Sequence, residues 1–389
     1  MKKSITVVTG SRADFGMLKG LLRLLQNSAE LDLNLIVTGS HLSQMHGFTS
    51  NEIKESGFLE FQTIELNLSL MSEDKAGFVV SEVVAKFSEH LSRHQPSIVI
   101  LLGDRYEIFG VAIACATQGI PIGHIHGGEV TQGSRDEIYR HAITKLSSVH
   151  FVANEEFSRR VLQLGENPGN VHVVGGLGVD SISEVELFSK SEMEKCLGFC
   201  ISDNLAIVTF HPDTNNPAET AKQVETLLGA LVQLPEVQFV ITGANADYQG
   251  DEVNSKLRDA ATMHSNLFFT FSLGQRGYFS MLSLAKVVVG NSSSGLLEAP
   301  TFGLATVNIG ARQNGRPRAN SIIDVSCSES SIKQGILTAL SEEFQILSAT
   351  AENPYGEPGA SIKILKTLEK LNFNSLLPKR FFDNVIGEI

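Results

Sequence analysis

The chain has 389 residues, a length that predicts two domains in an α/β protein. It carries 31 Lys and Arg against 43 Asp and Glu, a formal net charge of −12 at pH 7. This acidity excludes general binding to nucleic acids or anionic membranes, because phosphate-rich partners require a basic face. With 42% hydrophobic and 19% charged residues, the composition is that of a globular protein with large cores and excludes a disordered chain.

No apolar run is long enough for a secretory leader or a membrane span. Residues 5–8 form a run of four, whereas a leader needs about seven or more apolar residues and a span about 18. The four cysteines, Cys115, Cys196, Cys200 and Cys327, include no CxxC pair, so neither a zinc knuckle nor a thioredoxin-type redox site is indicated. We therefore expect free thiols in a reducing compartment and a cytoplasmic protein.

The first half of the chain alternates short apolar runs with amphipathic stretches. The runs are rich in Val and Ile, as buried strands are, and cover residues 4–9, 33–39, 97–103, 120–125, 150–153 and 171–175. Helices are predicted between them at residues 17–26, 78–93, 106–118, 136–147 and 155–164. Strands without polar alternation, each followed by a helix, predict a parallel sheet covered on both faces.

A second series of the same kind follows a polar segment without a strand, residues 181–204, where we expect the interdomain connection. Its strands are predicted at residues 205–210, 237–242, 267–271, 286–289, 304–309 and 321–325, and its helices at residues 220–231, 251–263, 276–284, 331–340 and 358–371. The sequence thus predicts an α/β protein of two Rossmann-like domains with a cleft between them. The domains are residues 1–185 and 186–357, and residues 358–389 form a C-terminal helix and tail that pack back on the first domain.

Ligands of open parallel sheets bind beyond the carboxyl ends of the strands, so polar segments there are the candidate site. The first strand ends in Gly10-Ser11-Arg12-Ala13-Asp14-Phe15-Gly16. Backbone N–H groups at a helix start, together with Arg12, suit a phosphate. The glycine spacing fits neither a dinucleotide-binding fingerprint nor a Walker A loop. An ordinary tight turn with a surface arginine would also explain the segment.

Acidic residues follow two later strands. Asp104 and Arg105 come after residues 98–102 and form either a structural ion pair or an acid–base group beside an anion-binding arginine. Glu129 ends the segment His124-Ile125-His126-Gly127-Gly128-Glu129, and we expect it near Asp104. The two histidines would share one side of a strand, but no third ligand is spaced to complete a metal site, so we expect no metal.

Asp136 stands at the start of the next helix, either as its N-cap or as a third carboxylate of the site. In the second domain, His211 ends the first strand, where it would face the cleft opposite the carboxylates or be a loop residue.

The segment Gly290-Asn291-Ser292-Ser293-Ser294-Gly295 leads a buried strand into three serines at a helix start. Hydroxyls, backbone amides and the helix dipole there form a phosphate cradle, unless the serines only cap the helix. Glu298, one turn into that helix, can accept two hydrogen bonds from a ribose diol. A cluster of Arg312, Arg316 and Arg318 suits a nucleotide diphosphate or is a solvated basic face.

Six segments in this order and spacing resemble the UDP-N-acetylglucosamine 2-epimerase family: Gly10 to Gly16, Gly103-Asp104-Arg105, His126 to Glu129, Arg140-His141-Ala142-Ile143-Thr144-Lys145, Phe210-His211-Pro212, and Gly290 to Gly295. The resemblance covers roughly residues 4 to 370 and is to the hydrolysing branch used in sialic- and legionaminic-type sugar synthesis. It implies a GT-B-like arrangement with the active site in the interdomain cleft and UDP held mainly by the second domain.

The resemblance also implies roles for particular residues. The catalytic residues are Asp104, Glu129, Asp136 and His211. The nucleotide-sugar contacts are Arg12, Arg105, Asn245, Ser292, Ser293, Glu298 and Arg312. No cofactor and no metal are implied, and enzymes of this kind are commonly homodimers or homotetramers.

The implied reaction fits these residue types. Elimination of UDP across C1 and C2 needs a base near C2 and stabilisation of the departing diphosphate. The resulting glycal takes up water at C1 and a proton at C2 from the other face, which releases the free 2-epimer. Two faces require at least two acid–base groups; Asp104, Glu129 and Asp136 offer them, and His211 can protonate an oxygen. Which carboxylate acts as acid or base stays open.

The expected activity is therefore that of a hydrolysing UDP-GlcNAc 2-epimerase, which gives free ManNAc and UDP. The same chemistry on UDP-2,4-diacetamido-2,4,6-trideoxyglucose stays open, because no motif reads the substituents at C4 and C6. A non-hydrolysing 2-epimerase, a GT-B glycosyltransferase with an acceptor and a catalytically silent nucleotide-sugar sensor are also compatible with parts of the pattern.

Overall fold

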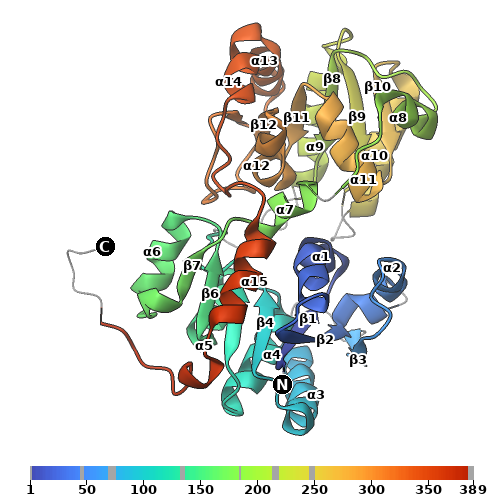
Figure 1. Ribbon diagram of the computed structural model, residues 1–389. Coiled ribbons are helices and arrows are strands. Elements are labelled where there is room, and N and C mark those ends of the chain that lie inside the picture. Colours follow the sequence, from blue (N-terminus) through green and yellow to red (C-terminus); the bar gives the residue numbers. More distant parts are fainter. Residues whose placement is uncertain are drawn as a thin grey trace. The chain divides into compact units, whose positions relative to one another are not determined.

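The computed structural model describes residues 2–43, 48–68, 76–131, 136–183, 185–212, 219–244 and 250–383. The chain divides into two compact units, a first unit of Met1–Ser181 with Gly356–Ile389 and a second unit of Ile182–Tyr355 (Figure 1). Each contains one parallel sheet with helices, so the predicted α/β class with two parallel sheets is confirmed.

The sheet of the first unit has seven parallel strands in the order β3-β2-β1-β4-β5-β6-β7. The strands are β1 (Lys3–Thr9), β2 (Leu31–Thr38), β3 (Gln62–Ile64), β4 (Ile98–Leu102), β5 (Ile122–Ile125), β6 (Val149–Val152) and β7 (Val171–Val173). The helices are α1 (Arg12–Gln26), α2 (Ser50–Glu55), α3 (Ala76–His94), α4 (Tyr106–Thr117), α5 (Asp136–Leu146), α6 (Glu155–Gln163) and α15 (Ala360–Lys370), and α7 (Leu177–Ser183) crosses the boundary between the units.

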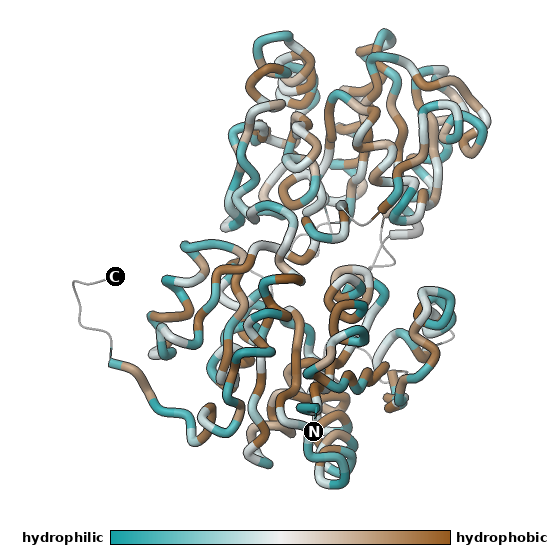
Figure 2. Tube along the Cα trace, viewed as in Figure 1, coloured by the Kyte–Doolittle hydropathy of each residue, from teal (hydrophilic) through white to brown (hydrophobic). Residues whose placement is uncertain are grey.

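Two clusters of apolar side chains cover the two faces of this sheet, which explains why its central strands read as continuous hydrophobic runs. Figure 2 colours the backbone trace by hydropathy, with hydrophobic residues in brown. One cluster joins alternate residues of β1 to α1 and α15, and the other joins the remaining strand residues to α3 and α4. The predicted helix 106–118 is α4, and its apolar side is core, because it packs closely on α3: a Cβ at Gly110 would lie 2.7 Å from Val83.

The C-terminal helix α15 belongs to the first unit, although the chain has passed through the second unit before it forms. Ile364 and Leu368 are fully buried in the cluster that contains Leu18 and Leu22 of α1. Asp180 accepts hydrogen bonds from the backbone N–H groups of residues 360 and 361, at 2.8 and 2.5 Å, so a buried carboxylate caps the start of the helix.

The sheet of the second unit has six parallel strands in the order β10-β9-β8-β11-β12-β13. The strands are β8 (Leu205–Thr209), β9 (Gln238–Thr242), β10 (Leu267–Thr270), β11 (Val287–Gly290), β12 (Ala305–Ile309) and β13 (Ile322–Val325). The helices are α8 (Lys190–Leu197), α9 (Thr220–Val232), α10 (Gly250–Met263), α11 (Gly274–Leu284), α12 (Ser294–Leu297), α13 (Glu329–Leu340) and α14 (Glu342–Ala349).

The sequence did not predict the strand β3 or the short helices α2, α7, α8 and α14. β3 has only three residues and is defined by parallel pairing with β2, a contact between distant parts of the chain. In the part of the chain that the structure describes, no helix has the length and apolarity needed to cross a lipid bilayer.

Candidate functional site

Two of the predicted acidic residues of the first unit follow neighbouring strands. β1, β4 and β5 are adjacent in the sheet, so the segments after their carboxyl ends lie at one edge. Asp104 follows β4 and Glu129 follows β5, while Asp136 is the first residue of α5.

The buried guanidinium of Arg140 on α5 joins these segments. It forms an ion pair with Asp104, and it donates hydrogen bonds to the Glu129 carbonyl at 2.9 Å and to the Thr131 hydroxyl at 3.1 Å. Its side chain is only 4% exposed. Arg140 therefore fixes Asp104 relative to the loop that carries Glu129. Arg140 was quoted from the sequence as part of a motif but was assigned no role. The signal that could have identified it is its position, one turn into the helix that begins at Asp136.

His126 holds the Glu129 carboxylate. Its Nδ1 lies 2.8 Å from Glu129 Oε1, and its Nε2 accepts a hydrogen bond of 3.2 Å from the backbone N–H of Leu177. The short distance between Nδ1 and Oε1 places the imidazole directly against the buried carboxylate. The backbone of His126 is left-handed, with φ of 67°. This conformation is rare outside glycine and costs energy, and such strain concentrates at functional sites.

The turn between His126 and Glu129 needs glycine. Gly128 has φ of 78°, and a Cβ there would lie 2.4 Å from the carbonyl oxygen of Phe157 in α6. Any side chain at this position would push the loop away from α6 and displace Glu129.

His124 is a core residue. It is fully buried, its Nε2 donates to the Gly103 carbonyl at 2.8 Å, and its Nδ1 accepts from the Thr144 hydroxyl at 3.0 Å. Burial lowers the pKa of His124 to about 3, so it is neutral at physiological pH. Among the described residues, no three His, Cys, Asp or Glu side chains are grouped so as to hold a metal ion.

Asp136 has an unusual proton affinity. Desolvation and, after it, the neighbouring Asp104 carboxylate raise the pKa of Asp136 to about 6, against the opposing charges of Arg105 and Arg140. A carboxyl group with a pKa near 6 exchanges protons readily close to neutral pH, as an acid–base catalyst must.

The two predicted arginines of the first unit are both paired. Arg105 Nε lies 2.5 Å from Oε1 of the fully buried Glu107, so the pair of unlike charges is not Asp104 with Arg105. Arg12 is largely exposed and lies 3.0 Å from Glu52 of α2. Sequence reasoning missed both acidic partners, because Glu52 comes from a distant helix and Glu107 gave no motif.

A further buried carboxyl group, Asp14, belongs to the same edge of the sheet. Burial raises the pKa of Asp14 to about 6, and the charge of Arg105 opposes this shift. Its Oδ2 has no hydrogen-bond partner among the described residues.

In the second unit, Asn291 binds the ends of β8 and β11 together. Its Oδ1 accepts a hydrogen bond of 2.7 Å from the His211 N–H, and its Nδ2 donates to the His211 carbonyl at 2.8 Å. The Asn291 carbonyl accepts from Arg312 at 3.2 Å and from Gln313 at 2.8 Å. The predicted His211 and Arg312 are thus brought together. Burial and the Arg312 charge lower the pKa of His211 to about 4, so this ring is neutral at pH 7.

The serine loop begins at Gly290, where only glycine fits. Its φ is 139°, and a Cβ would lie 2.0 Å from the Thr209 carbonyl oxygen of the neighbouring strand. Ser292 and Ser293 follow at the start of α12, and Ser294 accepts a hydrogen bond of 2.8 Å from the Tyr278 hydroxyl. α12 has only four residues, so Glu298 directly follows the helix instead of lying within it.

Glu298 has one carboxylate oxygen to spare. Burial raises its pKa, while Ser294 and the charge of Arg316 oppose the shift. Within the described residues its Oε2 has no hydrogen-bond partner, and neither has Nε of Arg316. Arg318 is instead bound to Asp324 at 2.6 Å. The remaining predicted contact, Asn245, lies outside the residues that the structure describes.

Comparisons with known proteins point to one family. A family model described as UDP-N-acetylglucosamine 2-epimerase matches residues 23–369. The chain is 35% identical over 368 residues to polysialic acid biosynthesis protein P7 of Escherichia coli, covering 94% of each. It is 36% identical over 387 residues to the GDP/UDP-N,N'-diacetylbacillosamine 2-epimerase (hydrolyzing) of Campylobacter jejuni, covering 98% of this chain and 99% of the relative.

Among solved structures, the UDP-GlcNAc 2-epimerase of Neisseria meningitidis bound to UDP-GlcNAc matches with a TM-score of 0.79. The match covers 95% of this chain and 100% of that one at 20% identity, which establishes a common fold and confirms the predicted GT-B-like class. Both the fold and the match over residues 23–369 lead to one conclusion: the chain belongs to the UDP-N-acetylglucosamine 2-epimerase family.

Proposed function

We propose that the protein is a hydrolysing UDP-GlcNAc 2-epimerase, which converts UDP-GlcNAc and water to free ManNAc and UDP. The observation that carries the proposal is the group of three carboxyl residues around Arg140. Asp104 and the Glu129 loop are held by its guanidinium, and Asp136 has a pKa of about 6. Such a group offers more than one proton donor or acceptor at one edge of a sheet.

In the first step, a carboxylate of this group removes the proton from C2 while the bond from C1 to the UDP oxygen breaks. A 2-acetamidoglucal and UDP result. Proton abstraction from a weakly acidic carbon requires an oriented base, and the contacts of Glu129 with His126 and of Asp104 with Arg140 supply that orientation.

In the second step, water adds to C1 and a proton is delivered to C2 from the opposite face, so the configuration at C2 is inverted and free ManNAc forms. This step needs a protonated acid as well as a group that accepts the proton of water. Asp136, whose raised pKa keeps part of it protonated near pH 6, is proposed as one of these groups.

The second unit is proposed to bind UDP. Ser292, Ser293 and Arg312 would contact the diphosphate, and Glu298 would accept hydrogen bonds from the ribose hydroxyls through the oxygen that lacks a partner among the described residues. His211, neutral at pH 7, can serve as an acid–base group for the departing or attacking oxygen. Arg12, Arg105 and Asn245 are also proposed to contact the nucleotide sugar.

A second substrate, UDP-N,N'-diacetylbacillosamine, has a specific observation in its favour. The Campylobacter relative, aligned over 98% of this chain, and a Legionella pneumophila relative 31% identical over 375 residues are both named hydrolysing 2-epimerases of that sugar nucleotide. A Neisseria meningitidis relative, 32% identical over 340 residues, is named for UDP-N-acetylglucosamine.

The proposal is tested by incubating the pure protein with UDP-GlcNAc and, separately, with the diacetylated 6-deoxy analogue, in ²H₂O and without any acceptor. We expect stoichiometric UDP, a free 2-epimer and deuterium at C2. UDP-ManNAc as the product would indicate a non-hydrolysing epimerase. Absence of UDP from both substrates would refute the proposed function.

The proposed setting is the cytoplasm, because Cys196 and Cys200 are exposed free thiols, which persist in reducing compartments. A homodimer or homotetramer is proposed as the assembly, and light scattering of the purified protein measures it.

A further inference from the structure

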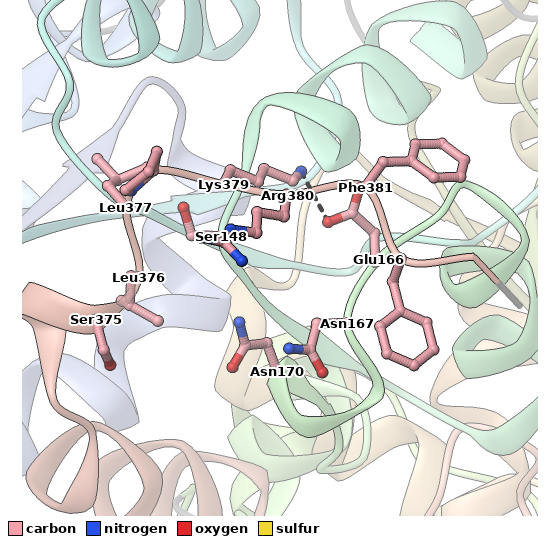
Figure 3. A pocket seen from close by; sticks show the side chains of 12 residues that line it. Ser148, Glu166, Asn167, Asn170, Ser375, Leu376, Leu377, Lys379, Arg380 and Phe381 are labelled. Atoms are coloured by element: carbon pink, nitrogen blue, oxygen red, sulfur yellow. Dashed lines mark ion pairs between the residues drawn. The ribbon is translucent and has the colours of Figure 1, made fainter.

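A cavity of about 400 Å³ lies in the first unit, away from the candidate catalytic residues. It is lined by the residues just before β6 and β7 and by the C-terminal tail: Ser148, Glu166, Asn167, Asn170 and residues 375–382 (Figure 3). Ser148 and Asn170 stand at the amino ends of these strands, whereas Asp104 and Glu129 follow the carboxyl ends of β4 and β5. In a parallel sheet these are opposite edges.

The tail that forms one wall is fixed by hydrogen bonds. Lys379 donates to the carbonyls of Lys145 and Ser147 at 2.5 and 2.6 Å and pairs with buried Glu166 at 2.7 Å (Figure 3). The N–H of Phe382 donates to the Gly165 carbonyl at 3.0 Å. The cavity is therefore a built feature of the fold.

Several polar groups of the lining have no partner within the described part of the chain. They are the hydroxyl of Ser148, the amide of Asn170, Nδ2 of Asn167 and the guanidinium of Arg380. Ser148 is only 3% exposed, whereas Asn167 and Arg380 are exposed. A hydroxyl, two amides and a guanidinium that line one cavity are together available to bond to a polar ligand.

Charge indicates the sign of that ligand. The lining contains Lys379 and Arg380 against one carboxylate, Glu166, whose own bonds are made to Lys379, Lys145 and His150. The cavity is thus locally positive in a chain of net charge −12. The guanidinium of Arg380, which has no acidic partner among the described residues, offers the planar fork that binds carboxylate or phosphate.

We propose that this cavity binds a monosaccharide-sized anion, a sugar acid or a sugar phosphate. The anionic group would pair with Arg380, sugar hydroxyls would bond to Ser148, Asn167 and Asn170, and the rings of Phe381 and Phe382 offer apolar surface to the sugar ring. Binding here is independent of the proposed epimerase activity, because the cavity shares no residue with the candidate site.

The test is isothermal titration calorimetry of the full chain with glucuronate, glucose 6-phosphate and neutral glucose. We expect at least one of the two anions to bind, with glucose at least about tenfold weaker. Binding of glucuronate alone assigns a carboxylate ligand, and binding of glucose 6-phosphate alone assigns a phosphate. Saturating UDP is expected to leave this binding unchanged.

Arg380→Gln is expected to weaken the anion about tenfold or more, and Asn170→Ala to weaken it as well. Arg380 makes no contact that the fold requires, so its variant should keep the wild-type melting temperature. Arg23→Gln, which removes an exposed arginine of α1, is the matched control and should bind normally. The proposal is overturned if neither anion binds, if UDP displaces the anion, or if Arg380→Gln binds as tightly as wild type.

Discussion

Nδ1 of His126 lies 2.8 Å from Oε1 of Glu129, while the other ring nitrogen accepts from the backbone of Leu177. The imidazole is thus held from both sides, and it holds the carboxylate in turn. The residue keeps this place despite the strain of a left-handed backbone. We infer that His126 is a positioning residue for Glu129.

Two substitutions separate this role from a merely structural one. Asparagine tolerates a left-handed backbone and can donate from Nδ2, whereas glycine tolerates the backbone and donates nothing. We expect His126→Asn to keep kcat within about threefold of wild type and His126→Gly to lower it about 10- to 100-fold. Loss of the contact with Nδ1 leaves the Glu129 carboxylate less well oriented, so kcat should fall more than KM rises in His126→Gly only. Equal kcat and KM for the two variants would count against the inference.

Asp104→Asn and Glu129→Gln are each expected to abolish measurable turnover, because a proton-transfer group contributes about 10²- to 10⁴-fold to the rate. Both residues lie in the first unit, whereas UDP is proposed to bind the second. UDP should therefore bind both variants with the wild-type Kd in calorimetry. Wild-type rates in either variant would remove that residue from the mechanism.

Arg140→Gln is expected to destabilise the protein, because it leaves the Asp104 carboxylate and the Glu129 carbonyl without their buried partner. We expect the free energy of unfolding to fall by about 3 kcal/mol and kcat to fall more than KM rises. Urea denaturation and steady-state kinetics measure the two effects. Arg93→Gln is the control; it removes an exposed arginine bound to Glu89 and should change stability by less than about 1 kcal/mol. A stability loss no larger than that of the control would contradict the role given to Arg140.

Asp14 should make the protein less stable as pH rises. Its pKa is about 6 in the folded protein and 3.8 in its ordinary state, so the folded state holds this proton more tightly than the unfolded chain. Stability from this group is complete below about pH 4 and is lost as pH rises to about 6, by up to about 3 kcal/mol. Asp14→Asn removes the titration, so the difference in unfolding free energy, variant minus wild type, should increase from pH 4 to pH 7. A difference that stays constant over this range would show that Asp14 titrates normally.

Glu298 offers a test of ribose recognition. If Glu298 Oε2 accepts hydrogen bonds from the ribose hydroxyls, wild-type protein should bind UDP about tenfold more tightly than 2′-deoxy-UDP. Glu298→Ala should lose this preference. Calorimetry with both nucleotides measures the coupling. Ser348→Ala, at a buried hydroxyl on α14, serves as the control that keeps the preference. An unchanged ratio in Glu298→Ala would place the ribose elsewhere.

The predicted strands and long helices agree with the structure to within about two residues at most ends, because each is encoded locally. β4 is a run of five buried apolar residues, and α9 carries its buried residues at helical spacing. Short elements were missed for the opposite reason. β3 is stabilised by its pairing with β2, and α2 is a helix of six residues, so neither contains enough local pattern to be recognised.

The candidate site also combines features that are encoded locally with contacts between distant residues. The order of motifs along the chain was sufficient to predict the family and to nominate Asp104, Glu129 and Asp136, since their residue types and their places after strands are properties of the sequence. The partners of these residues were not predictable in this way. Asp104 pairs with Arg140, 36 positions away, and not with the adjacent Arg105.

The charges of the protein also show which properties follow from the sequence and which require the tertiary structure. Sequence alone determined the two parallel sheets with their helices, the net negative charge and the set of candidate residues. Hydrophobic periodicity, composition and the motifs at strand ends are all properties that can be read along the chain. Only the tertiary structure decided which charges neutralise each other, which carboxyl groups have raised pKa values, and that a locally positive cavity exists under the C-terminal tail. These properties depend on distances and burial between residues remote in sequence, and electrostatic energies change steeply with both.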